Sequence, residues 1–398
     1  MATERVYFPN LNGLRFIAAL LVIVHHVEQF KTLLHIKSRW THSPFVEVIG
    51  KLGVVLFFVL SGFLITYLLL VEERNSGTIR VGRFYLRRAL RIWPLYFLTV
   101  ALGLGVYPHL SINPLAGLAE RVLLARVGLF WTLYLSFLPN LAVAWLGVVP
   151  YVSHTWSIGT EEQFYVLWPL VLSAGRRFRP VLIVSVGLVC LGAGFAVSSD
   201  LDTFAFKRVA AGFLSLFNID CMAVGGFVAL LAFGNSRHLR WLRSAPVFYS
   251  TVVLVLVLIG KGVRFRLLHY EIYSILFAIL ILNLATRPGA GRGLENGVMR
   301  YLGTISYGLY MYHPICIVTA MVVVRQAGLT SDFVLYPLAL GLVVSVAALS
   351  YRFFEAPFLK AKTRFAVVAS GDPGFAALAP LDAKLGGSRP SAQSLPAS

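Results

Sequence analysis

The chain has few charged residues for its length, and this scarcity excludes an ordinary soluble protein. Charged side chains make up 13% of its 398 residues, against about 25% in soluble domains, and 58% of the residues are hydrophobic. Cysteine is scarce as well. The three cysteines lie in apolar runs without the spacing of metal ligands, so we expect no metal and interpret them as small core residues. They are Cys190, Cys221 and Cys316.

Acidic residues are the scarcer kind of charge. The chain has 17 Asp and Glu against 35 Lys and Arg, which gives a net charge of +18. In a soluble protein this excess would favour nucleic acid as a partner. Here the arginines gather in short connections between apolar runs, which is the positive-inside pattern of membrane proteins. We therefore expect a lipid bilayer as the setting and no nucleic acid.

Long apolar runs recur along most of the chain and predict an all-α polytopic membrane protein. The first run is too long and too polar for a signal peptide, so we expect it to be retained. The charges of the connections favour about ten crossings from eleven runs. The runs cover residues 12–34, 51–71, 91–107, 126–146, 160–174, 179–197, 210–232, 246–260, 270–286, 302–324 and 333–352.

The arginine-rich loop 74–91 predicts which side each run faces. It should be cytoplasmic, which places both termini in the cytoplasm. Later basic loops fit only if the run 126–146, which Pro139 interrupts, is re-entrant or interfacial. The basic loop 261–269 falls on the predicted outer side, so the sidedness of the middle spans stays open. The expected localisation is the inner (plasma) membrane.

Two regions follow from composition. Residues 1–360 form the predicted transmembrane domain. Residues 361–398 are rich in Gly, Ala, Pro and Ser, which predicts a disordered cytoplasmic tail without an appended catalytic domain.

The first apolar run contains an arginine and two histidines, which are costly in a membrane and therefore indicate function. Arg15 and His26 lie within about 20° of each other on a helix, whereas His25 lies to the side. Histidine suits a general base because it exchanges a proton near neutral pH. The alternative is a hydrogen-bonded pair that fixes helix packing.

Two further stretches each allow either a structural or a functional interpretation. Ser61 and Gly62 in mid-span favour close helix packing, or a hydroxyl beside a passage for a ligand. Arg83, Arg87 and Arg91 recur every four residues and form a cationic ridge with Arg88 nearby. Topology alone explains this ridge, but guanidinium groups also suit a polyphosphate.

A third group of polar residues lies within the later apolar runs or at their ends. Glu161 and Glu162 suit the first turn of a helix, yet one of them should face the bundle interior. His313 lies in an apolar run and needs a partner. Glu355 follows the last run, where it would pair with an arginine, and Asp220 has no assigned partner.

These stretches together resemble the integral-membrane acyltransferase 3 family, over most of residues 7–360. The signatures stand in the family's order: Leu14-Arg15 through His26, Leu56-Phe57-Phe58 through Gly62-Phe63, Phe84 to Pro94, Trp156-Ser157 to Phe164-Tyr165, Ser306-Tyr307 to His313, and Glu355 to Pro357. The family pattern matches His26 and Glu161. The esterase-like domain that often follows is missing, so this is expected to be a stand-alone form.

The resemblance implies transfer of an acyl group, with acetyl expected, from acyl-CoA to a hydroxyl of a cell-envelope or secreted carbohydrate or lipid-linked glycan. His26 would be the base, with Glu161 orienting it and Arg15 stabilising negative charge. The other expected site residues are His25, His313 and Ser61 as secondary candidates, Arg83, Arg87, Arg88 and Arg91 for acyl-CoA, and Trp156, Ser157 and Tyr307 for the acceptor. The alternative function is a proton-coupled transporter of a sugar or lipid.

Overall fold

The computed structural model describes residues 5–370, apart from 39, 41–42, 111–112, 124–125, 199–204, 235–238, 288 and 330. Its ten longer helices that carry the predicted spans are α1 (Leu11–Leu33), α2 (Pro44–Ser76), α3 (Val81–Val100), α7 (Trp156–Ser173), α8 (Arg179–Ser198), α10 (Ile219–Phe233), α12 (Ala245–Gly260), α13 (His269–Thr286), α15 (Ser306–Gln326) and α16 (Asp332–Ser350).

Shorter elements connect these helices. The short α-helices are α4 (Ala116–Leu123), α5 (Val127–Leu135), α6 (Pro139–Leu146), α9 (Ala205–Leu216), α11 (Leu239–Leu242), α14 (Gly297–Thr304) and α17 (Ala356–Thr363). Two π-helical segments, η1 (Ala101–Val106) and η6 (Tyr351–Glu355), extend α3 and α16. The 3₁₀ turns are η2 (Tyr107–His109), η3 (Ser153–Thr155), η4 (Arg176–Phe178) and η5 (Arg292–Glu295). Strands β1 (Arg5–Val6) and β2 (Ala369–Ser370) pair in parallel.

The helical membrane architecture expected from the apolar runs is confirmed. Within the described ranges, eight helical segments are long and apolar enough to cross a membrane, so the protein is a multi-pass membrane protein. The two other predicted spans correspond to α7, which carries Glu161 and Glu162, and to α12, which has 16 residues.

The run 126–146 is broken into two short helices, as the sequence suggested. α5 has 9 residues and α6 has 8, well short of the ~20 residues that a crossing needs. The break lies at Phe137, whose φ is 57°, two residues before Pro139. Because proline has no backbone N–H and a fixed φ, it starts a helix more readily than it continues one.

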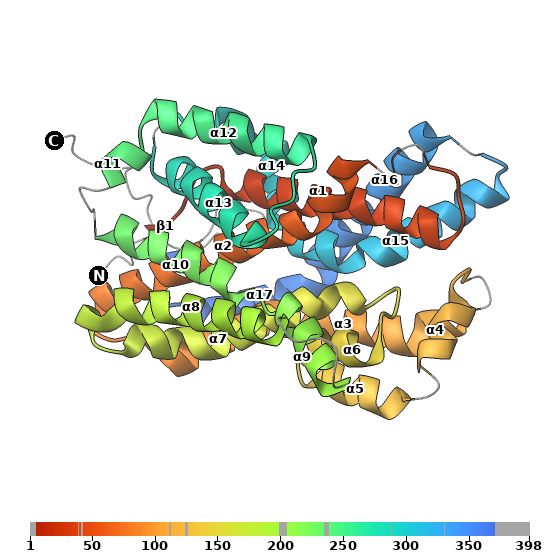
Figure 1. The fold of residues 1–398 in the computed structure, drawn as a ribbon, viewed down its shortest axis with the longest axis horizontal. Coiled ribbons are helices and arrows are strands. Elements are labelled where there is room, and N and C mark those ends of the chain that lie inside the picture. The colour runs from red at the N-terminus through yellow and green to blue at the C-terminus, as the bar shows by residue number, and fades with distance from the viewer. Residues whose placement is uncertain are drawn as a thin grey trace, which may run out of the picture.

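Helix α2 is the centre of the bundle. It packs against α1, α10, α13, α7 and α12, and Figure 1 shows α1 and α2 running between the layer of α12 and α13 and the layer of α7 and α8. Gly62 and Gly225 bring α2 and α10 together. A Cβ at Gly62 would lie 2.0 Å from the Met222 carbonyl oxygen, and a Cβ at Gly225 would lie 2.1 Å from that of Val59. The packing interpretation of Gly62 is therefore correct.

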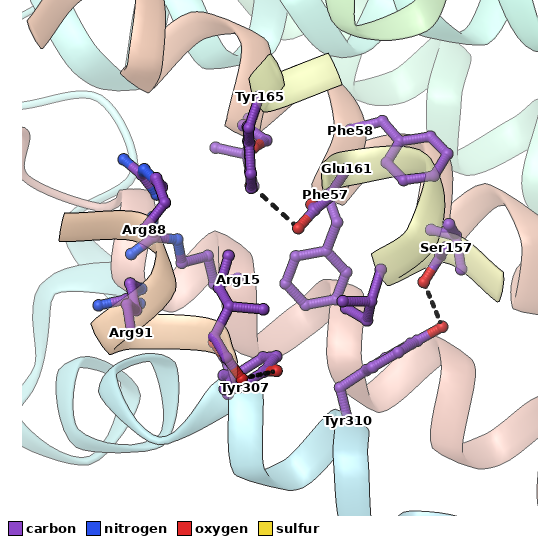
Figure 2. Close-up of a pocket in the computed structure, with 16 residues that line it drawn as sticks. Arg15, Phe57, Phe58, Arg88, Arg91, Ser157, Glu161, Tyr165, Tyr307 and Tyr310 are labelled. Carbon is purple, nitrogen blue, oxygen red and sulfur yellow. Dashed lines mark hydrogen bonds between the residues drawn. The ribbon is translucent and has the colours of Figure 1, made fainter. Parts of the chain in front are cut away.

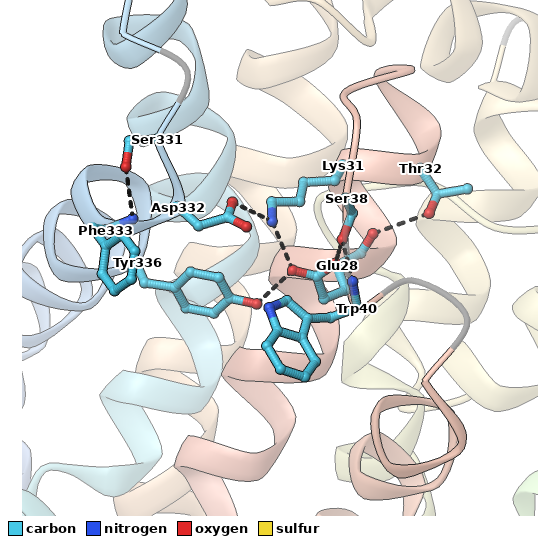
Figure 3. Close-up of polar contacts among 9 residues, drawn as sticks. All are labelled: Glu28, Lys31, Thr32, Ser38, Trp40, Ser331, Asp332, Phe333 and Tyr336. Carbon is cyan, nitrogen blue, oxygen red and sulfur yellow. Dashed lines mark hydrogen bonds and ion pairs between the residues drawn. The ribbon is translucent and has the colours of Figure 1, made fainter.

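A buried ionic cluster fixes the far end of α1 against α16 (Figure 3). Lys31 is fully buried and lies 2.8 Å from Glu28 and 2.5 Å from Asp332. Glu28 also accepts hydrogen bonds from Tyr336, at 2.5 Å, and from Ser38. We call this end of the bundle, where α1 ends, the distal end, and the end where α1 begins the proximal end.

The described part of the predicted tail begins as ordered chain. α17 continues to Thr363, Arg87 donates a hydrogen bond to the Phe365 carbonyl (3.1 Å), and β2 pairs with β1. Residues 371–398 lie outside the described part, and the prediction of disorder there stays a prediction.

Candidate active site

A cavity of about 90 Å³ lies between α1, α2, α3, α7 and α15 (Figure 2). Basic, acidic and hydroxyl side chains face into it beside apolar ones, although its walls belong to spanning helices. Buried polar groups of this kind mark sites in membrane proteins. The lining residues are Arg15, Val54, Phe57, Phe58, Leu60, Ser61, Arg88, Arg91, Ile92, Ser157, Ile158, Glu161, Tyr165, Ser306, Tyr307 and Tyr310.

One wall of the cavity is cationic. Arg15 from α1 meets Arg88 and Arg91 from α3 there (Figure 2). Within the described part of the chain none of the three forms a contact ion pair with a carboxylate, although Glu161 interacts electrostatically with all three. Arg87 points elsewhere, because it is paired with Glu72 at 2.7 Å. Three guanidinium groups without a paired carboxylate make this wall suitable for an anion with several oxygens, such as a phosphate.

A hydrogen-bonded chain crosses the next wall. The Tyr165 hydroxyl donates to Glu161 (3.0 Å), so the Ser61 hydroxyl, 2.8 Å away, donates to Tyr165. Glu162 does not line the cavity and accepts a hydrogen bond from the Trp93 indole N–H (3.1 Å). Of the two neighbouring glutamates, Glu161 is therefore the one that faces the cavity.

The wall opposite the arginines is closed by a small cluster of hydroxyl groups (Figure 2). The Tyr310 hydroxyl donates to the His154 carbonyl (2.7 Å) and lies 2.8 Å from the Ser157 hydroxyl. We call Ser157, Tyr310 and the His154 carbonyl the partition. Tyr307, one turn earlier on α15, donates to the Ile92 carbonyl (2.9 Å).

Three histidine rings pack together beyond the partition. The ring of His313 lies 4.6 Å from that of His26 and 5.0 Å from that of His154, centre to centre. Nδ1 of His26 lies 2.8 Å from the Val22 carbonyl, one turn earlier. Because a carbonyl only accepts, Nδ1 carries the proton, and Nε2 of the neutral ring has a free lone pair. This is the tautomer that a general base needs.

His25 serves packing instead. Its Nδ1 donates to the Val46 carbonyl (2.8 Å), and a Cβ added at Gly50 would lie 2.4 Å from its ring. The ring therefore fills the space that Gly50 leaves on α2. His25 does not line the cavity.

Arg15 and His26 share a helix face but not a site. Eleven residues separate them, which is about 16 Å along α1. Arg15 lies beside Arg88, Arg91 and Glu161, whereas His26 does not line the cavity. The Val22 carbonyl, rather than Glu161, orients the His26 ring. The structure thus divides the predicted catalytic residues into two groups along α1.

A family model described as an acyltransferase domain matches residues 8–352. The chain belongs to this family. The resemblance carried by the six signatures is thereby confirmed, and the family's enzymatic class is acyl transfer. No solved structure matches the chain.

Several bacterial relatives match this acyltransferase-family chain over most of its length. The peptidoglycan O-acetyltransferase OatA of Listeria monocytogenes is 23% identical, covering 90% of this chain and 56% of the relative. A Bacillus subtilis protein provisionally named a peptidoglycan O-acetyltransferase is 25% identical, over 88% of this chain and 55% of its own. A Staphylococcus aureus protein provisionally named an O-acetyltransferase is 26% identical, over 89% and 58%. The chain thus spans little more than half the length of these relatives.

The remaining predicted residues of the acyltransferase lie around these features. Ser157 and Tyr307 line the cavity, and Ser61 joins its hydrogen-bonded wall. Trp156 does not line it; its ring packs against Phe58 at 6.1 Å between centres. Arg83 is exposed and lies outside the cavity.

The structure adds two residues that the sequence did not single out. His154 completes the three packed histidines, and Lys362 of α17 lies close to Arg91, Arg88, Arg15 and Arg87. Both belong to segments far from their neighbours in the sequence. Among the described residues, no group of three His, Cys, Asp or Glu side chains is placed to hold a metal ion.

Proposed function

We propose that the chain transfers an acetyl group from acetyl-CoA to a hydroxyl of a cell-envelope glycan, with peptidoglycan as the acceptor. The proximal end faces the cytosol in this proposal, because the arginine-rich connections lie there. The family match and the names of the relatives support the reaction class. The two groups of polar residues along α1 support the division of labour that follows.

The donor occupies the cavity. Its phosphates bind Arg88 and Arg91, with Arg15 and Lys362 adding positive charge, since guanidinium groups recognise phosphate with paired hydrogen bonds. The extended pantetheine arm of CoA separates its phosphates from its sulfur. This arm would carry the acetyl group along the cavity from the arginines toward the partition at Ser157 and Tyr310.

The acceptor approaches from the distal end, where His26 is half-buried with Nε2 free. The acetyl thioester has to pass the partition to reach the acceptor. The acceptor oxygen then attacks the thioester carbonyl as His26 Nε2 takes the hydroxyl proton. The carbon–sulfur bond then breaks, and the proton passes from His26 to the sulfur. The products are an O-acetylated sugar and CoA with a free thiol, and His26 is regenerated.

One observation carries this proposal. Helix α1 contributes Arg15 to the cavity on one side of the partition, and His26 with its free Nε2 on the other side. The experiment is transfer of radiolabelled acetyl from acetyl-CoA to glycan strands released from peptidoglycan, by the full chain in proteoliposomes. His26→Ala should lower the rate about 10²–10⁴-fold, the usual contribution of a general base.

His109→Ala is the matched control, because His109 is exposed on η2, away from the cavity. It should leave the rate unchanged. Retained transfer by folded His26→Ala would contradict the role of His26. Absence of transfer by the unmodified chain would contradict the proposed function. Glycan movement across the membrane without consumption of acetyl-CoA would support the transporter instead.

A further inference from the structure

The three packed histidines form a separate group with its own chemistry. They come from α1, η3 and α15, and His313 and His154 are 0% and 6% exposed. The backbone carbonyl of His154 and the hydroxyls of Ser157 and Tyr310 form the partition. None of the three imidazole rings lines the cavity, and those of His154 and His313 pack against the ring of Tyr310. We call His26, His154 and His313 the histidine cluster.

The backbone fixes the proton positions in two of these rings. Nδ1 of His313 lies 2.6 Å from the Tyr310 carbonyl, just as Nδ1 of His26 lies 2.8 Å from the Val22 carbonyl. Each Nδ1 must therefore donate, so each Nε2 of a neutral ring can only accept. Rings packed this closely in the interior stay neutral, because adjacent like charges there are strongly unfavourable.

The cluster has hydrogen-bonding capacity that the described chain does not use. His313 Nε2 and both ring nitrogens of His154 are buried without a hydrogen-bond partner; the Met311 backbone lies beside the His154 ring. Buried polar atoms normally have a partner, and leaving one unmade is costly. Three unused nitrogens from two side chains in one place therefore point to a ligand.

The unused atoms also indicate what kind of ligand this is. Counting His26 Nε2, the cluster offers three acceptors and a single N–H donor, on His154. A ligand that satisfies it must supply mainly donors. A thioester carbonyl or a phosphate has only acceptors, whereas an N-acetylated sugar supplies both O–H and N–H donors.

We propose that the histidine cluster binds two hydrogen-bond donors of the acceptor sugar, the hydroxyl to be acylated on His26 and a second donor, a hydroxyl or an amide N–H, on Nε2 of His313. This rests on the proposed function, because it names the acceptor end of the same reaction. His154 contributes the N–H that an oxygen of the sugar can accept. The site would select an acceptor that has a second donor within reach of the acylated hydroxyl over one whose hydroxyl stands alone.

The experiment compares His313→Phe with His313→Gln in the purified full chain. Phe keeps the ring volume but removes the acceptor, whereas the Gln amide places a polar atom near the position of Nε2. For peptidoglycan glycan strands, Phe should raise KM about threefold to tenfold, the effect of losing one neutral hydrogen bond. Gln should recover most of this loss. KM for acetyl-CoA should not change in either variant, and His109→Gln should match the unmodified chain.

A binding measurement keeps this test separate from catalysis. The Kd of glycan strands, measured without acetyl-CoA, should rise by the same factor in His313→Phe. If strands bind in this pattern but no acetyl is transferred, the proposed function fails and the hydroxyl site stands. An unchanged Kd and KM in folded His313→Phe, or equal losses in Phe and Gln, would overturn the site and leave the cluster as packing around ordered water.

Discussion

Arg88 offers the sharpest test of the donor site. Its guanidinium lies over the rings of Tyr165 and Phe84, at 5.3 and 5.7 Å from their centres, and so is held in place. It forms no ion pair with a carboxylate of the described chain, and it faces the cavity. A phosphate that reaches it therefore breaks no contact ion pair, although it meets the nearby carboxylate of Glu161. Arg88→Gln keeps a polar side chain and removes the charge.

The expected magnitude follows from the type of hydrogen bond that this substitution removes. A hydrogen bond to a charged group contributes about 1.5–3 kcal/mol. Since each 1.36 kcal/mol is a factor of about ten, KM for acetyl-CoA should rise roughly 10- to 150-fold in Arg88→Gln.

The assay uses two donors that differ only beyond the pantetheine arm. Steady-state acetyl transfer is measured with acetyl-CoA and with S-acetylpantetheine, which lacks the phosphates. Arg88→Gln should raise KM for acetyl-CoA and leave KM for S-acetylpantetheine unchanged. Raised salt should weaken acetyl-CoA binding in the unmodified chain more than in the variant. Arg240→Gln, an exposed arginine on α11, is the control. Equal losses with both donors would refute the reasoning, because the phosphates would then have no part in the effect.

Three further predictions concern other parts of the fold. Lys31→Met should destabilise the chain by about 3–5 kcal/mol, because it leaves the buried carboxylate of Glu28 unpaired; thermal unfolding in detergent measures this. Gly225→Ala should lower the same unfolding midpoint, because its Cβ would lie 2.1 Å from the Val59 carbonyl oxygen. Lys362→Ala should raise KM for acetyl-CoA while leaving kcat unchanged, because it removes one positive charge beside the arginines.

Each of these predictions has an internal control. The double variant Lys31→Met/Glu28→Gln should recover much of the lost stability, and no recovery would mean that the ion pair is not the cause. Gly341→Ala meets nothing within 4 Å and should be neutral. Lys360 is exposed on the same short helix as Lys362, and Lys360→Ala should leave KM for acetyl-CoA unchanged. If both variants raised KM equally, the effect would come from the overall positive charge of the helix and not from the position of Lys362.

The sequence predicted the helices well because their signal is local. Apolar runs and the break at Pro139 depend on neighbouring residues, and the structure has helices and a break in those places. The choice of Glu161 over Glu162 also agrees with the side chain that faces the cavity. Asp220 is different: its partner Glu271 and the nearby Lys51 come from other helices, so no local pattern could indicate them.

Helix periodicity predicts a face, but not its partners or its depth. The spacing of Arg83, Arg87 and Arg91 places them on one ridge, yet α3 is turned so that Arg88 and Arg91 reach the cavity. That rotation is set by packing against α7, α15 and α17. The shared face of Arg15 and His26 likewise does not place them in one site, because eleven residues of helix put them about 16 Å apart along the axis.

The partition has a consequence for the membrane itself. A polar cavity on one side and imidazoles on the other would together make a conduit for protons, discharging the gradient that the membrane maintains. The hydroxyls of Ser157 and Tyr310 and the His154 carbonyl bond to one another, so these groups offer no open hydrogen-bonding position to a file of water at this point. In the proposed function, an acetyl group passes the partition while the membrane remains electrically insulating.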